Sequence, residues 1–322
     1  MSLRPNCSWG ECVVLFFAIS GFVIPYSLRK KASRGVGAAS ATFAIRRLFR
    51  LFPAYWVSVF AAALFWPVVG MPADGSTVLA NLTMFQTAFG FADVIGLYWS
   101  LRVEVVFYAL CLLLFVPALL QRPAWLAGAV AQGLFLYVSG SVLKRSVTPG
   151  TWPGTLEHFP LYALFIAVMF WGALLRWALG RGAEPLGRWT ACVLFGFPVT
   201  ILAVPLLLNI ASHWRAVPSG QTIPHALGLL IFIVMSMRVR LQSRFAAWLG
   251  RISYSLYLFH PLVFVALLSA ITQGYFPWLA HAHLGVVLAT CIALSIAVAA
   301  IVFYTVEAPA IRLGRWLSAG AT

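Results

Sequence analysis

The sequence predicts an all-α, polytopic integral membrane protein, and three observations support this fold class. First, 62% of the 322 residues are hydrophobic, only 9% are charged, and the mean hydropathy is +0.94. Second, apolar runs of about 20 residues, the length that spans a bilayer core, recur along the whole chain. Third, Lys and Arg residues concentrate in alternate loops between these runs. A soluble core does not require so many apolar residues.

Nine apolar runs are predicted to cross the membrane. In chain order they are residues 12–28, 51–70, 97–120, 124–143, 160–179, 190–210, 223–238, 252–272 and 284–305. The polar stretches between them are too short for a separate soluble domain. We therefore expect one integral membrane domain over residues 1–322.

The net charge of +15 is explained by membrane topology rather than by nucleic acid binding. With nine spans, 17 of the 22 Lys and Arg residues fall in one set of alternate loops. The other five are Arg4, Arg102, Lys144, Arg145 and Arg215. Because basic residues mark cytoplasmic loops, this bias predicts a cytoplasmic C-terminus. Membrane lipid is the expected partner, and no nucleic acid is expected.

The cysteines predict neither a metal site nor a redox site. No CxxC and no metal-ligand spacing occurs among Cys7, Cys12, Cys111, Cys192 and Cys291. All but Cys7 fall within the predicted spans, where packing is the expected role.

The predicted span of residues 97–120 contains two charged residues, Arg102 and Glu104. An ionised side chain at the bilayer centre costs roughly 3 kcal/mol. Ser100, Glu104 and Tyr108 are four apart and share one helix face, whereas Arg102 and Glu104, two apart, do not face each other. Glu104 is therefore a functional candidate, because a partly buried carboxylate can act as a general base near neutral pH.

Arg47 and Arg50 lie where a predicted cytoplasmic loop becomes a span. They are three residues apart and share one helix face. One interpretation is anchoring by snorkelled side chains. The other interpretation is that the two arginines bind an anionic ligand, because Arg binds phosphate in bidentate fashion. For the neighbouring Arg46 we expect anchoring alone.

A second polar stripe runs along the predicted span of residues 252–272. Ser253, Tyr257 and His260 follow the spacing i, i+4, i+7 of one helix face. His260 is either a base or a hydrogen-bonded core histidine. For Glu307, at the end of the last span, we expect a structural ion pair with a basic loop.

Two small residues, Ser20 and Gly21, lie in the middle of the first span. We expect Gly21 to allow close helix packing. For Ser20 two interpretations stay open, packing against a helix and facing a polar cavity.

Five stretches together resemble the acyltransferase-3 family of integral membrane acyltransferases. They are LFFAISGFVI, the RLFRLFP run from Arg47, WSLRVEVVFY, ISYSLYLFHP and YTVEAP, which occur in the family's order. The resemblance implies transfer of an acyl group, often acetyl, from a cytoplasmic acyl-CoA donor to a hydroxyl of a surface glycan or glycosylated small molecule. It also implies a bacterial inner membrane location and no permanently bound cofactor.

The resemblance also assigns roles to residues. Arg47 and Arg50 match the family's Arg-x-x-Arg and would contact the phosphates of the donor. Glu104 matches the acid of the family's Trp-Ser-Leu-x-x-Glu motif and would lie by the reacting centre. Further motif positions without a settled role are Ser20, Tyr257 and His260.

The chain departs from the family pattern at its start. Family members usually begin with a helix that carries an arginine and a histidine thought to be the catalytic base. The topology count also calls for a preceding helix. Val14 and Val105 stand where the family often has acids. Two alternatives therefore stay open, a transporter or permease and an inactive truncated acyltransferase homologue.

Overall fold

The computed structural model describes residues 10–29, 35–70, 74–146, 158–180, 186–211, 219–238 and 243–319. Within these ranges all regular structure is helical, which confirms the all-α prediction. Six of the described helices are long and apolar enough to cross a membrane: Val36–Val69, Tyr98–Phe115, Pro123–Lys144, Phe159–Leu179, Arg244–Thr272 and Leu284–Ala319. The other three expected spans coincide with shorter apolar stretches: Val13–Leu28, Arg188–Ile201 and Leu227–Ser236. The count of nine stays a prediction.

The chain divides into two compact units, and it contributes two segments to each. Unit 1 comprises Met1–Gly37 and Arg102–Arg240, and unit 2 comprises Ala38–Leu101 and Leu241–Thr322. The expected single domain over residues 1–322 stays a prediction.

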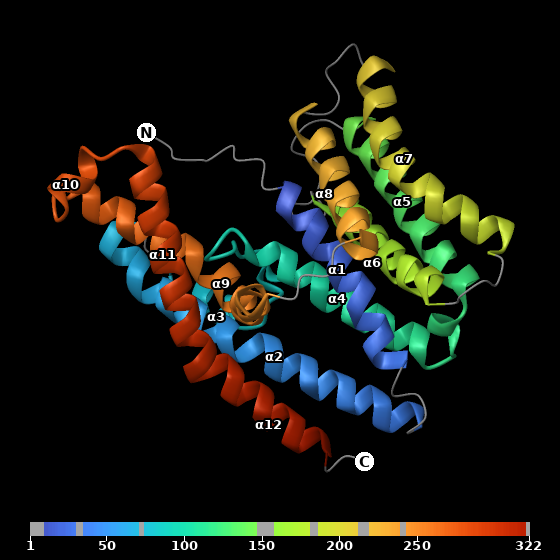
Figure 1. Ribbon diagram of the computed structural model, residues 1–322, viewed down its shortest axis with the longest axis horizontal. Helices are drawn as coiled ribbons and strands as arrows, with labels where there is room; N and C mark the ends of the chain where they lie inside the picture. Colours follow the sequence, from blue (N-terminus) through green and yellow to red (C-terminus); the bar gives the residue numbers. More distant parts are fainter. Residues whose placement is uncertain are drawn as a thin grey trace. The chain divides into compact units, whose positions relative to one another are not determined.

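Unit 1 is a helical bundle with α6 at its centre (Figure 1). Nearly every side chain of α6 between Ala163 and Leu175 is buried. The indole of Trp171 donates to the carbonyl of Leu194 on α7 at 2.9 Å. The helices of this bundle are α1 (Gly10–Arg29), α5 (Pro123–Ser146), α6 (Phe159–Leu179), α7 (Arg188–Ala211) and α8 (Ser219–Arg238), joined by most of α4 (Tyr98–Phe115).

Two glycines let α1 and α6 approach closely. A Cβ atom at Gly21 would lie 1.9 Å from the carbonyl oxygen of Met169, and one at Gly172 would lie 2.4 Å from the carbonyl oxygen of Ala18. No side chain larger than hydrogen fits at either position, because these neighbours are backbone atoms. The packing role expected for Gly21 is therefore confirmed.

Unit 2 is built around α9, against which α11 packs (Figure 1). Two expected spans, 51–70 and 252–272, are parts of longer helices that begin at Val36 and Arg244, so both Arg47 and Arg50 are helical. The helices of unit 2 are α2 (Val36–Phe65), α3 (Gly75–Asn81), α9 (Arg244–Thr272), α10 (Pro277–Ala280), α11 (Leu284–Val302) and α12 (Ala308–Ala319), joined by the first turn of α4.

Asn81 organises the loop that leads from α2 to α4. Its amide nitrogen donates to the carbonyls of Thr77 and Ala92, and its amide oxygen accepts from the Val94 N–H at 3.0 Å. The phenol of Tyr55 on α2 donates to the Asn81 carbonyl. Because one fully buried side chain satisfies three backbone groups, the loop that sets the start of α4 is fixed to α2.

A π-helical turn, Phe303–Glu307, connects α11 to α12. The N–H of Ala308 donates to the carbonyl of Phe303, the i→i+5 bond of a π-helix. The sequence explains this turn. Pro309 has no N–H, so it cannot donate the α-helical hydrogen bond to the carbonyl of Thr305. The wider turn adds one residue and changes the direction of the side chains that follow it.

Candidate functional site

Ser100 on α4 and Tyr257 on α9 meet within unit 2, as members of two different predicted stripes. Their hydroxyl oxygens lie 2.5 Å apart, and each lies 3.0 Å from the carbonyl oxygen of Leu97. The two hydroxyls have two protons for these three contacts. One hydroxyl therefore donates to Leu97 and the other donates to the first hydroxyl, so the pair closes the first turn of α4 onto α9.

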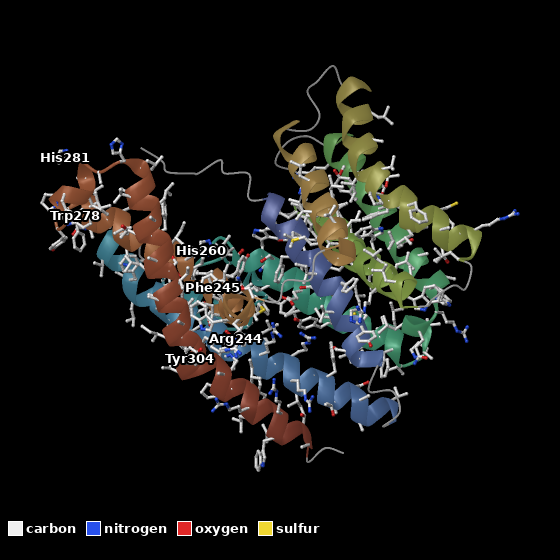
Figure 2. All side chains as sticks on the ribbon, in the orientation of Figure 1. Arg244, Phe245, His260, Trp278, His281 and Tyr304 are labelled. Carbon is white, nitrogen blue, oxygen red and sulfur yellow. The ribbon has the colours of Figure 1, made fainter. Side chains whose placement is uncertain are left out.

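His260 lies one helical turn after Tyr257 on α9, and Figure 2 labels it between Arg244, the first residue of α9, and Trp278 on α10. Its Nδ1 lies 2.9 Å from the carbonyl oxygen of Tyr257 and 3.1 Å from that of Leu256. Carbonyl oxygens only accept, so Nδ1 carries a proton. In the neutral ring Nε2 then has the lone pair that a base requires.

Ser253 is exposed, and its hydroxyl donates to the carbonyl of Gly250 in its own helix at 2.9 Å. The buried serine of this stretch is Ser255, which donates to Oε2 of Glu307 at 2.6 Å. The sequence pattern did not single out Ser255. The sequence did contain a signal that Ser255 is buried. Ser255 lies three residues before Leu258, which places both on the buried face of α9.

The three arginines of α2 have different partners. Nε of Arg46 donates to the hydroxyl of Ser318 on α12 at 2.8 Å, so Arg46 does more than anchor the helix. The guanidinium of Arg47 lies 5.3 Å from the ring centroid of Phe43. Arg50 is exposed and interacts electrostatically with Glu307.

The structural ion pair expected between Glu307 and a basic loop stays a prediction. The carboxylate of Glu307 accepts a hydrogen bond from Ser255. Arg50, which belongs to the stretch predicted as the basic loop, lies inside α2 in the structure.

In unit 1, Glu104 and Tyr108 lie on one face of α4, as their spacing predicted. The phenol of Tyr108 donates to Oε1 of Glu104. Both side chains are buried, and so is Arg102. A buried carboxylate requires such hydrogen bonds, because its desolvation is otherwise costly.

Two further polar residues are buried in unit 1. Ser20 is buried on α1, beside the glycine contact with α6. His225 on α8 is buried as well, and its ring centroid lies 6.0 Å from that of Phe165 on α6. His225 belongs to none of the predicted polar stripes, although a histidine inside a predicted span is a signal of function.

The described residues contain no group of three or more His, Cys, Asp or Glu side chains that could hold a metal ion. Cys192 and Cys291 form no disulfide, and Cys111 is buried in unit 1. Cys7 lies outside the described residues. The expectation of no metal and no bound cofactor stays a prediction.

Comparison with known proteins gives one family and one relative. The model of a family described as an acyltransferase domain matches residues 10–302. The peptidoglycan O-acetyltransferase OatA of Listeria monocytogenes serovar 1/2a (strain ATCC BAA-679 / EGD-e) is 23% identical to the chain over 286 residues. That alignment covers 79% of this chain and 45% of the relative, so the chain spans less than half of the relative's length. No solved structure matches the chain.

Proposed function

Because the chain belongs to the acyltransferase-3 family, we propose that it is a membrane O-acyltransferase. In this proposal it moves an acyl group, expected to be acetyl, from an acyl-CoA donor on the cytoplasmic side to a hydroxyl group. The acceptor class is a surface glycan or a glycosylated small molecule. The relative named as a peptidoglycan O-acetyltransferase supports an acetyl group and a glycan acceptor.

The observation that carries the proposal is the state of His260. Its Nδ1 donates to backbone carbonyls of its own helix, so in the neutral ring Nε2 carries the lone pair that a base requires. Glu104 is the second group with the chemistry of a base, and Tyr108 orients its carboxylate.

The proposed reaction is a direct acyl transfer. A base, His260 or Glu104, takes the proton of the acceptor hydroxyl as its oxygen attacks the thioester carbonyl. The new C–O bond forms, the C–S bond breaks, and the CoA thiolate takes up a proton. Hydrogen-bond donors that stabilise the oxyanion lower the barrier.

Arg47 and Arg50 are the proposed contacts for the donor phosphates. Both lie on the same turn of α2, and Arg50 is exposed. The bias of basic residues supports placing this end of the span, and the C-terminus, on the cytoplasmic side, where acyl-CoA is found. A bacterial inner membrane is the proposed location.

The proposal is tested by acetyl transfer in lipid nanodiscs, with acetyl-labelled acetyl-CoA and peptidoglycan fragments. Glu104→Gln should abolish transfer while the protein is still expressed and inserted. Near-normal acylation by this variant would contradict the assignment. If the unmodified protein neither transfers nor hydrolyses the acetyl group, a transporter or an inactive homologue becomes the better interpretation.

The donor role has its own test. Arg47→Ala combined with Arg50→Ala should raise the apparent KM for acetyl-CoA by about 100-fold or more, because each of the two charge-assisted bonds is worth roughly 1.5–3 kcal/mol. Arg46→Ala is the matched control, since it removes a neighbouring charge whose hydrogen bond goes to Ser318. An unchanged KM in the double variant would count against the phosphate role.

A further inference from the structure

The last two long helices of the chain form a run that is longer than a membrane core is thick. α11 has 19 residues, and the apolar stretch Leu284–Ala319, which includes the π-helical turn and α12, has 36 residues. At 1.5 Å per residue this stretch is about 54 Å long, whereas the hydrocarbon core of a bilayer is about 30 Å thick. α11 alone is long enough to span the core (Figure 1). α12 therefore begins close to the membrane surface at which α11 ends.

Tyr304 lies at the junction of the two helices and is labelled in Figure 2. Its side chain is exposed, and its hydroxyl accepts a hydrogen bond from the indole of Trp248 on α9 at 3.1 Å. Trp and Tyr are enriched at the level of the lipid headgroups, because their rings are apolar and their N–H and O–H groups are polar. This aromatic pair places the membrane surface near the π-helical turn.

One side of α12 is buried in unit 2. A Cβ at Gly314 would lie 2.6 Å from the Cβ of Phe49 on α2. The hydroxyl of Ser318 accepts a hydrogen bond from Nε of Arg46, also on α2, at 2.8 Å. These two contacts, four residues apart on α12, fix which side of the helix packs against α2.

The other side of α12 is apolar and exposed. Leu313, Trp316 and Leu317 lie on it, and Trp316 is 72% exposed. The charged residues of α12 are Arg312 and Arg315, both exposed, and the helix contains no acid. A helix that combines Trp and Leu on one face with Arg beside it is typical of a membrane interface.

The π-helical turn aligns this apolar face with the exposed side of α11. Ile301, near the end of α11, is 63% exposed. In an unbroken α-helix Leu313 would point about 120° away from Ile301, because each residue changes the direction by about 100°. The additional residue of the π-turn reduces this angle to about 20° and places Trp316 within about 40° of Ile301. The exposed apolar side of α11 therefore continues along α12.

We propose that α12 lies in the membrane surface at which α11 ends, with Leu313, Trp316 and Leu317 at the boundary between headgroups and acyl chains. Arg312 and Arg315 bind the phosphates of anionic phospholipids there. The partner is a lipid surface, because the apolar face continues that of a membrane-spanning helix and carries two cations without an acid. This role does not depend on the acyl transfer reaction, so either one can fail without the other.

Photo-crosslinking of the full chain in nanodiscs tests the position of α12. Trp316→p-benzoylphenylalanine places a photoreactive group on the apolar face, and Ile301→p-benzoylphenylalanine is the control within α11. We expect lipid adducts from both variants. Adducts from the Ile301 variant alone would show that α12 projects into water. A crosslink from the Trp316 variant to a second copy of the chain would assign the face to a protein interface. Either result overturns the proposal.

A second measurement tests the charge of the lipid. Native mass spectrometry of protein released from nanodiscs with equal amounts of phosphatidylglycerol and phosphatidylcholine gives the ratio of the two lipids retained. Arg312→Gln combined with Arg315→Gln should lower the share of phosphatidylglycerol by about tenfold, because basic residues near an anionic surface contribute to binding. Arg312→Lys combined with Arg315→Lys is the matched control, which retains both charges and should keep the ratio. An unchanged ratio in the Gln variant would overturn the role of the two arginines.

Discussion

The hydroxyls of Ser100 and Tyr257 lie 2.5 Å apart, and both lie 3.0 Å from the carbonyl oxygen of Leu97. All the hydroxyl protons of the pair are used within this group of three oxygens. Neither hydroxyl can therefore donate to an oxyanion without breaking a bond inside the protein. The pair is suited to fixing the start of α4 against α9, the helix that carries His260.

Tyr257→Phe should accordingly act mainly on stability. It removes the phenol's hydrogen bonds but leaves the bond from Ser100 to Leu97, so we expect a loss of about 1 kcal/mol in the free energy of unfolding. Acetyl transfer should fall by less than about tenfold, because the backbone that orients His260 remains. The thermal midpoint in detergent and the transfer rate measure the two effects. Tyr275→Phe is the control, at a residue 71% exposed.

A larger loss would revise the role of Tyr257. If Tyr257→Phe lowered the transfer rate by a factor of a thousand with an unchanged thermal midpoint, the phenol would be part of the chemistry.

His260→Asn should separate the structural use of the ring from its use as a base. The Asn amide nitrogen can replace Nδ1 as donor to the carbonyls of Leu256 and Tyr257, but it offers no basic Nε2. The thermal midpoint should stay near that of the unmodified protein. The transfer rate should fall by about 10²- to 10⁴-fold, the usual effect of losing a general base. Full activity in a stable His260→Asn variant would assign the proton transfer to another group.

Gly21→Ala should prevent α1 from packing on α6. The added methyl would lie 1.9 Å from the Met169 carbonyl oxygen, which is backbone and cannot move aside. We expect a destabilisation of about 3 kcal/mol or more, since overpacking typically costs 1–3 kcal/mol even against side chains. Size-exclusion chromatography after heating measures it.

Gly196→Ala on α7 is the matched control in the same unit. Apart from the backbone of its own helix and its chain neighbours, no described atom lies within 4 Å of its added methyl group. Because Ala is the better helix former by about 1 kcal/mol, this variant should be at least as stable as the unmodified chain. Equal stability of the Gly21 and Gly196 variants would show that the contact of α1 with α6 is looser than described.

Asp74 makes the stability of α3 depend on pH. Its carboxylate accepts from the Thr77 N–H at 2.9 Å and from the Ser76 hydroxyl at 2.8 Å, and these hydrogen bonds hold the pKa of Asp74 below its ordinary value. A lowered carboxyl pKa contributes stability above the unfolded-state pKa of about 4, and the contribution is lost as the pH falls through the folded-state value.

Asp74→Asn tests this dependence, because Asn also caps a helix but does not titrate. Between pH 6 and pH 3 the thermal midpoint of the unmodified chain should fall more steeply than that of the variant, and the difference should appear only below about pH 4. Parallel curves would mean that Asp74 titrates without influence on folding.

The sequence pattern within each helix predicted the features that involve a single helix. The apolar runs identified the helices, and the spacing of four placed Glu104 and Tyr108 on one face, where they form a hydrogen bond. The same rule places Ser253 on the face of Tyr257 and His260, but spacing does not give the direction of that face, and the Ser253 hydroxyl bonds within its own helix. Ser255 is the buried serine of that stretch.

The sequence by itself determined the helical class, the apolar spans and the polar stripes, because these follow from composition and a helical period of 3.6 residues. The tertiary structure decided which stripes meet. Ser100 and Tyr257 are 157 positions apart, and Ser255 and Glu307 are 52 apart. Local periodicity contains no information on such pairs, since helix packing and the π-helical turn at Glu307 set which side chains come into contact.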